Sequence, residues 1–254
     1  MLEYKVYEVG GVRSALEGMR YAFKSIPNSN RESDLQRADA LNTGGNPHNK
    51  FLRQIIAWIK VKADFTFWKQ MDTYRFGVDK NSSSTMHTLT KSPISYEDFG
   101  LTEREYEDSI YWHFVIDELE SIRLAYHRET DPAEKKKLEL EMFSKLPMSY
   151  QQERLISISY AALQKIMDER KDHKNPDWNR FLTVIDALPA NHLIKRTEPE
   201  PFILNNDHNQ TNPAPVWNGY GNQPTYQHIN KLKMFMDGNL FNPRFKEDEF
   251  VWKK

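Results

Sequence analysis

Three short segments of the chain distribute apolar side chains in the manner of β-strands. Residues 4–9 alternate polar and apolar positions and end at Gly10 and Gly11. Residues 154–158 alternate in the same way, whereas residues 55–61 are almost continuously apolar and rich in β-branched side chains. The pattern predicts three strands, of which 55–61 is buried.

Longer segments repeat apolar residues at three- and four-residue steps, which is the period of an amphipathic helix. These segments predict helices at 12–26, 103–127, 131–143, 159–170 and 176–188, and a further helix that begins at Asp64. Asp64, Asp131 and Ser159 carry side-chain oxygens suited to capping a first helical turn. Pro132 and Pro176 suit the start of a helix, where a missing N–H costs nothing.

The predicted helix at 103–127 carries the clearest apolar stripe, and we expect that stripe to be core. Its members are Tyr106, Ile110, Phe114, Leu119 and Ile122. The stripe is broad, which indicates a core shared with other subunits, so we expect a homo-oligomer.

The remaining segments are polar and lack a period. Residues 28–48 are expected to form a loop, and residues 79–84 a turn. Residues 199–224 are rich in Asn, Gln, Pro and Gly, and a short apolar-aromatic end follows. We therefore expect one domain at 1–198 and an extended tail at 199–254, for which docking onto a protein partner is one alternative. Isolated strands among long helices, without regular βαβ alternation, predict an α+β fold.

Charge and composition narrow the function classes. The 254-residue chain carries 35 basic and 36 acidic residues, which argues against a general nucleic-acid-binding protein, because such a protein needs basic excess to neutralise phosphates. No segment is apolar for long enough to span a bilayer, and the first residues do not resemble a signal peptide. The chain has no cysteine, which excludes disulfides, thiolate metal sites and cysteine nucleophiles. We expect a cytoplasmic protein without membrane association.

Two segments carry a resemblance to a known family. Residues 62–77 read KADFTFWKQMDTYRFG, and residues 81–87 read NSSSTMH. They resemble the signature of the flavin-dependent thymidylate synthases: a strand leaving through Lys-Ala-Pro, a helix to Gln, then Arg-His-Arg, and a loop Asn-Glu-x-Ser-x-Arg-Tyr. The Ser-Thr-Met-His variant of the loop is also similar to uncharacterised bacterial and phage proteins.

The second segment, residues 146–170, begins with Leu-Pro. It is similar to the later part of the same family, where a strand ends in Asn-Leu-Arg and a helix ends in Arg. With Pro147 aligned to the family proline, Leu163 and Arg170 fall at the family's spacing. The resemblance covers roughly residues 4–188 in order of elements. It implies a ThyX-like fold, with a small, mainly antiparallel sheet flanked by long helices, and a homotetramer with sites between subunits.

The resemblance also implies a chemistry and a set of site residues. In this family FAD carries hydride during the methylation of dUMP to dTMP. By resemblance Ser84 is the candidate catalytic residue, Arg75 and Ser84 are expected to contact the nucleotide, and Asn81 and Arg170 the nucleotide or the cofactor. The residues alone allow a plainer interpretation, in which 81–84 is an ordinary turn, since Asn and Ser favour turns.

Substitutions within the signature remove charge. The first two residues of Arg-His-Arg are Thr73 and Tyr74, and Lys80 and Lys91 are the nearest basic replacements. The other substituted family positions are Ser82, Met86, His87, Ser159 and Ala161. A charge-assisted phosphate contact is worth about 1.5–3 kcal/mol, so we expect FAD to bind poorly or not at all.

Other polar residues give weaker signals. His87 and His113, the latter four residues before Asp117, could bind a metal or titrate near neutrality, but no paired metal-ligand motif occurs and we expect no metal. An acidic and basic cluster near the end of one predicted helix is explained at least as well by a solvated face as by a site. Its members are Glu169, Asp172, His173 and Asp177. The family resemblance makes Asp177 and Arg180 candidates, although their spacing does not match the family closely.

Three functional hypotheses therefore follow from the sequence. The first is a thymidylate-synthase-like enzyme of the flavin-dependent family. The second is a non-catalytic nucleotide-binding descendant of that fold, and the third is a protein that binds a partner, with its tail as the active part. A shared fold does not decide among them, because function depends on the site residues.

Overall fold

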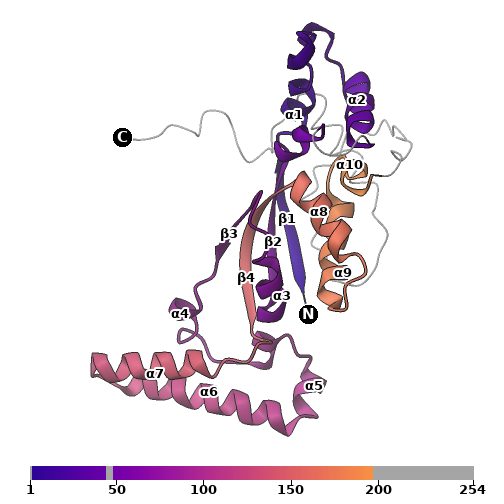
Figure 1. The fold of residues 1–254 in the computed structure, drawn as a ribbon. Coiled ribbons are helices and arrows are strands. Elements are labelled where there is room, and N and C mark those ends of the chain that lie inside the picture. Colours follow the sequence, from indigo (N-terminus) through magenta and orange to yellow (C-terminus); the bar gives the residue numbers. More distant parts are fainter. Residues whose placement is uncertain (1, 44–47, 197–254) are drawn as a thin grey trace, which may run out of the picture.

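A small antiparallel sheet forms the centre of the protein (Figure 1). The structure is a computed structural model and describes residues 2–43 and 48–196. Within these residues, four strands lie in the order β1-β2-β4-β3 and are antiparallel to their neighbours. Their bounds are Glu3–Gly10 (β1), Ile56–Asp64 (β2), Val78–Ser82 (β3) and Gln151–Ser159 (β4). The predicted α+β class with a mainly antiparallel sheet is confirmed.

Strand β2 shows how the sheet separates a buried face from an open one. Ala57, Ile59, Val61 and Ala63 alternate along it, and all four are fully buried. The intervening side chains are only half-buried, and Tyr7 and Leu155 on the adjacent strands are exposed. The sheet therefore buries one face against helices and leaves the other partly open.

Six helices of the described chain cover the buried face and the upper end of the sheet in Figure 1. They are α1 (Val12–Gly18), α2 (Arg31–Thr43), α3 (Phe65–Met71), α8 (Tyr160–Arg170), α9 (Pro176–Leu182) and α10 (His192–Lys195). Phe67 and Trp68 of α3, Leu163 of α8 and Phe181 of α9 join the strands in one continuous hydrophobic core. Burial of these large side chains is the main contribution that holds α3, α8 and α9 on the sheet.

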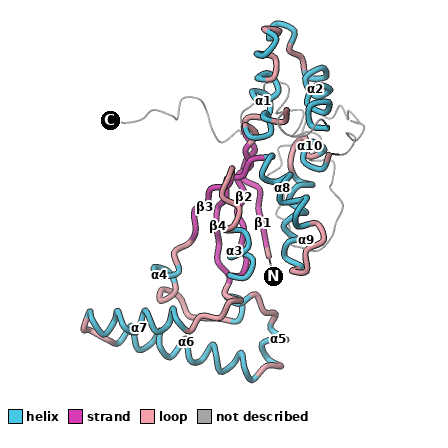
Figure 2. Tube along the Cα trace, in the orientation of Figure 1, coloured by secondary structure: helices cyan, strands magenta, loops and turns pink. Residues whose placement is uncertain are grey.

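The chain between β3 and β4 forms a separate helical lobe, seen at the lower end of the molecule in Figure 2. It contains α4 (Thr85–Thr88), α5 (Glu103–Glu107), α6 (Ile110–Arg128) and α7 (Pro132–Ser144). Leu89, Phe99 and Met142 contribute to its own small core. Phe65 and Tyr150 lie 5.7 Å apart between ring centres and connect the lobe to the start of α3.

The three predicted capping residues are confirmed. The Asp64 side chain accepts a hydrogen bond from the backbone N–H of Phe67 at 2.7 Å, and Ser159 accepts one from Ala162 at 3.2 Å. Asp131 accepts from two amides of the first turn of α7. These local interactions define the starts of α3, α7 and α8.

Four element predictions were wrong in part. The helix predicted at 12–26 ends at Gly18, and the helix predicted at 103–127 is broken between α5 and α6, where Ser109 caps α6. The loop predicted at 28–48 contains α2, and the turn predicted at 79–84 is largely strand β3. Both missed elements are mostly polar in sequence: β3 lies at a sheet edge, and α2 contributes only Leu35, Ala38 and Leu41 to the main core.

The apolar stripe of α5 and α6 is divided between inside and outside. Leu119 and Ile122 are buried as expected, but Ile110 is 88% exposed and Phe114 67% exposed in the single chain. The expectation that all of these side chains are core is therefore wrong for one chain alone.

The predicted tail at 199–254 lies outside the described residues, and the boundary at 198 stays a prediction. Among the described helices, none is long and apolar enough to cross a membrane.

Gly77, between α3 and β3, provides a test of the close packing around the sheet. Its φ is +71°, and a Cβ added there would lie 2.5 Å from the hydroxyl of Ser159, the cap of α8. We expect Gly77→Ala to lower the free energy of unfolding by about 1–3 kcal/mol, measured by chemical denaturation. Gly18→Ala is the matched control, because a Cβ there meets only Gln54 at 3.5 Å. Equal effects of the two substitutions would contradict this account.

Candidate functional site

The loop between α3 and β3 carries the positions that the resemblance aligns with Arg-His-Arg. The Thr73 hydroxyl donates a hydrogen bond to the carbonyl of Gln70 at 2.7 Å. Arg75 is exposed and makes no ion pair with any described residue. Arg75 therefore presents its guanidinium to solvent from a loop that begins at the end of α3.

Tyr74 and Arg170, far apart in the sequence, meet where the end of α8 lies against the loop after α3. The Tyr74 hydroxyl donates to the Glu169 carboxylate at 2.8 Å and accepts from Nε of Arg170 at 2.8 Å. The Arg170 guanidinium also lies against the ring of Tyr74, 5.5 Å from its centre, and against Trp178 at 4.8 Å. Burial, reinforced by the hydrogen bond to Glu169, raises the pKa of Tyr74 above its ordinary value. Arg170 is thus held by protein groups.

Asn81 and Ser84 lie on β3 and just after it. Asn81 is exposed and pairs across the sheet with Leu155, whereas Ser84 is half-buried at the cap position of α4 without a side-chain capping bond. Arg75 precedes β3 and Ser84 follows it. At about 3.3 Å per residue the strand between them spans about 13 Å. The structure therefore brings Arg170 to the Arg75 loop, but it does not bring Ser84 to Arg75 within one chain.

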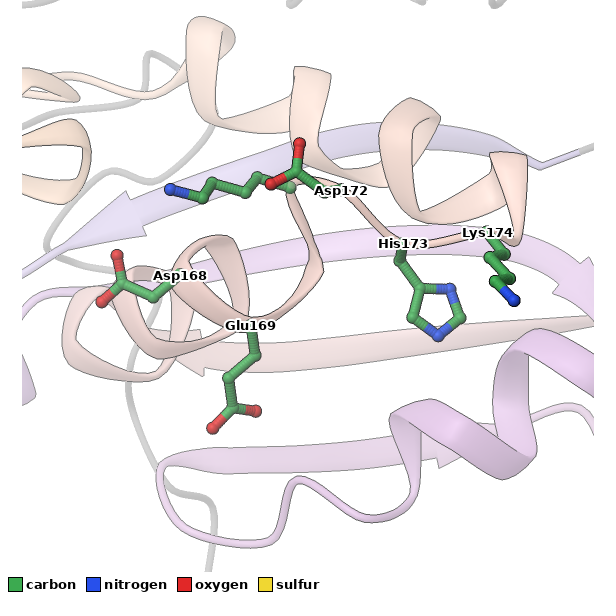
Figure 3. Close-up of a pocket in the computed structure, with 6 residues that line it drawn as sticks. Asp168, Glu169, Asp172, His173 and Lys174 are labelled. Carbon is green, nitrogen blue, oxygen red and sulfur yellow. The ribbon is translucent and has the colours of Figure 1, made fainter.

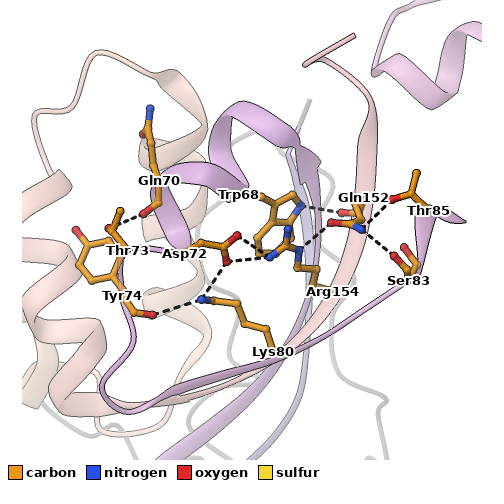
Figure 4. Close-up of polar contacts among 10 residues, drawn as sticks. All are labelled: Trp68, Gln70, Asp72, Thr73, Tyr74, Lys80, Ser83, Thr85, Gln152 and Arg154. Atoms are coloured by element: carbon orange, nitrogen blue, oxygen red, sulfur yellow. Dashed lines mark hydrogen bonds and ion pairs between the residues drawn. The ribbon is translucent and has the colours of Figure 1, made fainter. Parts of the chain in front are cut away.

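A network of polar contacts that the sequence analysis missed connects α3, β3 and β4 (Figure 4). Arg154 on β4 donates to both carboxylate oxygens of Asp72, at 2.9 and 3.1 Å, and stacks 4.3 Å above the Trp68 ring. Lys80 on β3 pairs with the same Asp72 at 3.1 Å and donates to the carbonyl of Tyr74 at 3.3 Å. Lys80 is thus engaged by Asp72 and does not take over the role of a lost phosphate-binding arginine.

The cluster at the end of α8 lines a surface hollow of about 390 Å³ (Figure 3). Glu169, Asp172 and His173 contribute to it, and Nδ1 of His173 accepts a hydrogen bond from the backbone of Asn175 at 3.1 Å. Asp177 does not belong to a solvated face: it is 8% exposed, pairs with Arg180 and accepts from the N–H of Leu2. Asp177 therefore anchors the start of β1.

The histidine candidates do not converge. His87 is exposed on α4, and His113 lies against the ring of Tyr106, 4.2 Å between ring centres, in the helical lobe. Within residues 2–43 and 48–196, no group of three or more His, Asp or Glu side chains has the geometry of a metal site.

Comparison with known proteins gives a likeness in fold. No protein-family model matches the chain, and no curated protein matches it in sequence. Among solved structures, two of thymidylate synthase X (ThyX) from Helicobacter pylori with FAD and dUMP are similar, each with a TM-score of 0.55 and 16% identity. The matches cover 76% and 75% of this chain and 96% of each ThyX chain. At this identity the likeness establishes the fold and leaves the activity open.

The positions aligned with Arg-His-Arg do not fit the pyrophosphate of FAD. The hydroxyl of Thr73 and the phenol of Tyr74 already have protein partners, and neither side chain carries a positive charge. Arg170, the cation beside Tyr74, is already engaged by the Tyr74 hydroxyl and the Trp178 ring, and the Glu169 carboxylate lies on the same hydroxyl. Arg75 is the one residue of the three with guanidinium donors open to solvent.

We predict that the purified protein lacks stoichiometric flavin. Arg75 alone offers too few charge-assisted contacts to retain FAD through dialysis. Visible absorbance of the dialysed protein, and of the supernatant after heat denaturation, measures bound flavin directly. A flavin spectrum of one equivalent per chain that survives dialysis would contradict the prediction.

Proposed function

We propose that this protein binds a nucleoside monophosphate, dUMP first among the candidates, with Arg75 at the phosphate. The observation that carries the proposal concerns Arg75: it is exposed, makes no ion pair with any described residue and lies in the loop after α3. Lys80 anchors this loop through Asp72 and the carbonyl of Tyr74. A guanidinium with free donors suits a phosphate, because two parallel N–H groups match two phosphate oxygens. The ThyX-like fold supports the choice of nucleotide.

Asn81 and Ser84 supply amide and hydroxyl groups at the other end of β3 in this proposal. Because β3 separates Ser84 from Arg75 by about 13 Å, we propose that Arg75 of one copy and Ser84 of another copy contact the same ligand. The protein is accordingly proposed to act as a homo-oligomer. Exposed Ile110 and Phe114 on α6 belong to the apolar surface proposed to bury against another copy.

Flavin-dependent methylation of dUMP to dTMP is the second candidate function. The observation in its favour is the likeness to two ThyX structures with FAD and dUMP, over nearly the whole of the ThyX chain. Ser84 is then the candidate catalytic residue, and Arg170 a cofactor contact. This candidate requires Arg170 to leave Tyr74 and Trp178, and it moves ahead if bound flavin is found.

The nucleotide proposal is tested by thermal shift. A ligand at 100 times its dissociation constant stabilises the folded state by about 2.7 kcal/mol. We expect dUMP to raise the unfolding temperature of the wild type. We expect Arg75→Ala to abolish the rise without lowering the ligand-free unfolding temperature, because Arg75 makes no ion pair among the described residues that the substitution would break.

Arg104→Ala is the matched control, since Arg104 is exposed on α5 with only a surface ion pair to Asp108. It should leave the nucleotide shift intact. If neither uracil nucleotides nor other mono- and dinucleotides stabilise the wild type, a partner-binding role becomes the better account.

Self-association is a separate prediction. We expect light scattering to report a mass that is a multiple of the single chain, because large apolar side chains as exposed as Ile110 and Phe114 are stabilised by burial. The double substitution Ile110→Ser and Phe114→Ser should shift the protein toward smaller species. Tyr21→Ser, at an exposed aromatic position near α1, is the control. A strict monomer at micromolar concentration would remove the two-copy site.

A further inference from the structure

One continuous series of side-chain contacts joins two segments at opposite ends of β3 (Figure 4). The first segment is residues 72–77, here called the Arg75 loop, and the second is residues 83–85, here called the Ser84 turn. The series starts at the carbonyl of Tyr74, which accepts from Lys80, and continues through Asp72 to Arg154. Nε of Arg154 then donates to the side-chain oxygen of Gln152 at 2.9 Å. The series thus joins both ends of β3 through side chains of the neighbouring strand.

Gln152 completes the series at the other end. Its amide nitrogen donates to the carbonyl of Ser83 at 2.8 Å and lies 3.3 Å from the hydroxyl of Thr85. Ser83 and Thr85 flank Ser84 directly, just as Tyr74 directly precedes Arg75. The contacts therefore end on the residues next to the two candidate ligand groups and leave the side chains of those two groups available.

Arg154 is the centre of the series. Its side chain is only 15% exposed. The guanidinium stacks on the Trp68 ring, donates two hydrogen bonds to Asp72 and donates one to Gln152. Trp68 is buried and donates its indole N–H to the carbonyl of Gln152 at 3.0 Å, which fixes the platform beneath Arg154. Lysine cannot reproduce this arrangement, because an ammonium lacks the planar fork.

We propose that Arg154 is a positioning residue that holds the Arg75 loop and the Ser84 turn in their ligand-binding geometry. The proposal rests on the proposed function for the identity of the ligand, a nucleoside monophosphate. Arg154 does not touch the ligand. It acts through Asp72 and Lys80 on one segment and through Gln152 on the other, so that both segments are ordered before the ligand arrives.

The proposal predicts how fast backbone amides exchange in each of the two segments that Arg154 joins. The amides of Thr73 and Tyr74, which donate to carbonyls at the end of α3, report on the Arg75 loop. The amides of His87 and Thr88, which donate to the carbonyl of Ser84, report on the Ser84 turn. We expect Arg154→Gln to speed exchange in both groups by about tenfold, the effect of losing one charge-assisted contact. Asp72→Asn should affect the first group alone, and Gln152→Ala the second group alone.

Glu153→Gln is the matched control. Glu153 is the adjacent residue of β4, and its side chain pairs with Lys60 on the opposite face of the sheet at 2.8 Å. It should change exchange in neither group. Chemical denaturation of each variant separates global destabilisation, which speeds exchange everywhere, from the local loosening expected here.

Nucleotide affinity supplies the second readout. If the wild type binds dUMP, Arg154→Gln and Arg154→Lys should each weaken binding by about tenfold or more, whereas Glu153→Gln should not. Unchanged affinity in Arg154→Gln would overturn the positioning role. The role would also be overturned if exchange sped up equally in all variants, Glu153→Gln included. The same holds if Arg154→Gln changed exchange in neither group of amides. If the wild type binds no nucleotide, the proposed function fails, and the exchange pattern alone decides whether Arg154 holds the two segments.

Discussion

Antiparallel pairing of β4 with both β2 and β3 is the constraint on which the rest of the structure depends. Strand β4 enters between two strands that precede it by many residues, and its register sets Ile156 and Ile158 into the core. The same register directs Arg154 toward Trp68 and Asp72. Side chains alternate with a period of two, so a slip of one residue would expose the isoleucines and direct Arg154 to the open face.

The insertion of β4 also explains the helical lobe. The chain leaves the end of β3 near Ser83, whose N–H bonds to the carbonyl of Glu153, and it returns at Gln151 beside the same point. Residues between these positions form α4–α7 with a core of their own. The Ser84 turn is therefore held on one side by the sheet and on the other by the start of the lobe, which makes it a defined position.

Local signals in the sequence were enough for elements with a cap or an apolar face, such as α3, α8 and strands β1, β2 and β4. Helix α2 was missed although Leu35, Ala38 and Leu41 recur at three-residue steps and pack on the main core, because most of its other positions are polar. One of them, Asp34, is buried and pairs with Arg20. Strand β3 is a polar edge strand, and such a strand has the composition of a turn. The candidate site was likewise predictable only where it follows the family signature. Asp72 and Arg154 meet through a contact between residues 82 positions apart, which no local pattern contains.

Three cations close to α3, which are Arg170, Lys80 and Arg154, bind protein groups, and this limits the ligands that the surface can take. Tyr74 replaces a basic residue of the family signature, and its hydroxyl accepts a hydrogen bond from Arg170. Lys80 and Arg154 share the carboxylate of Asp72. Transfer of any of these cations to a ligand would leave a partly buried group unpaired, at a cost similar to the free energy of the new interaction. A ligand that needs one guanidinium therefore matches this surface better than one that needs several, and this is the physical reason to expect a monophosphate at Arg75.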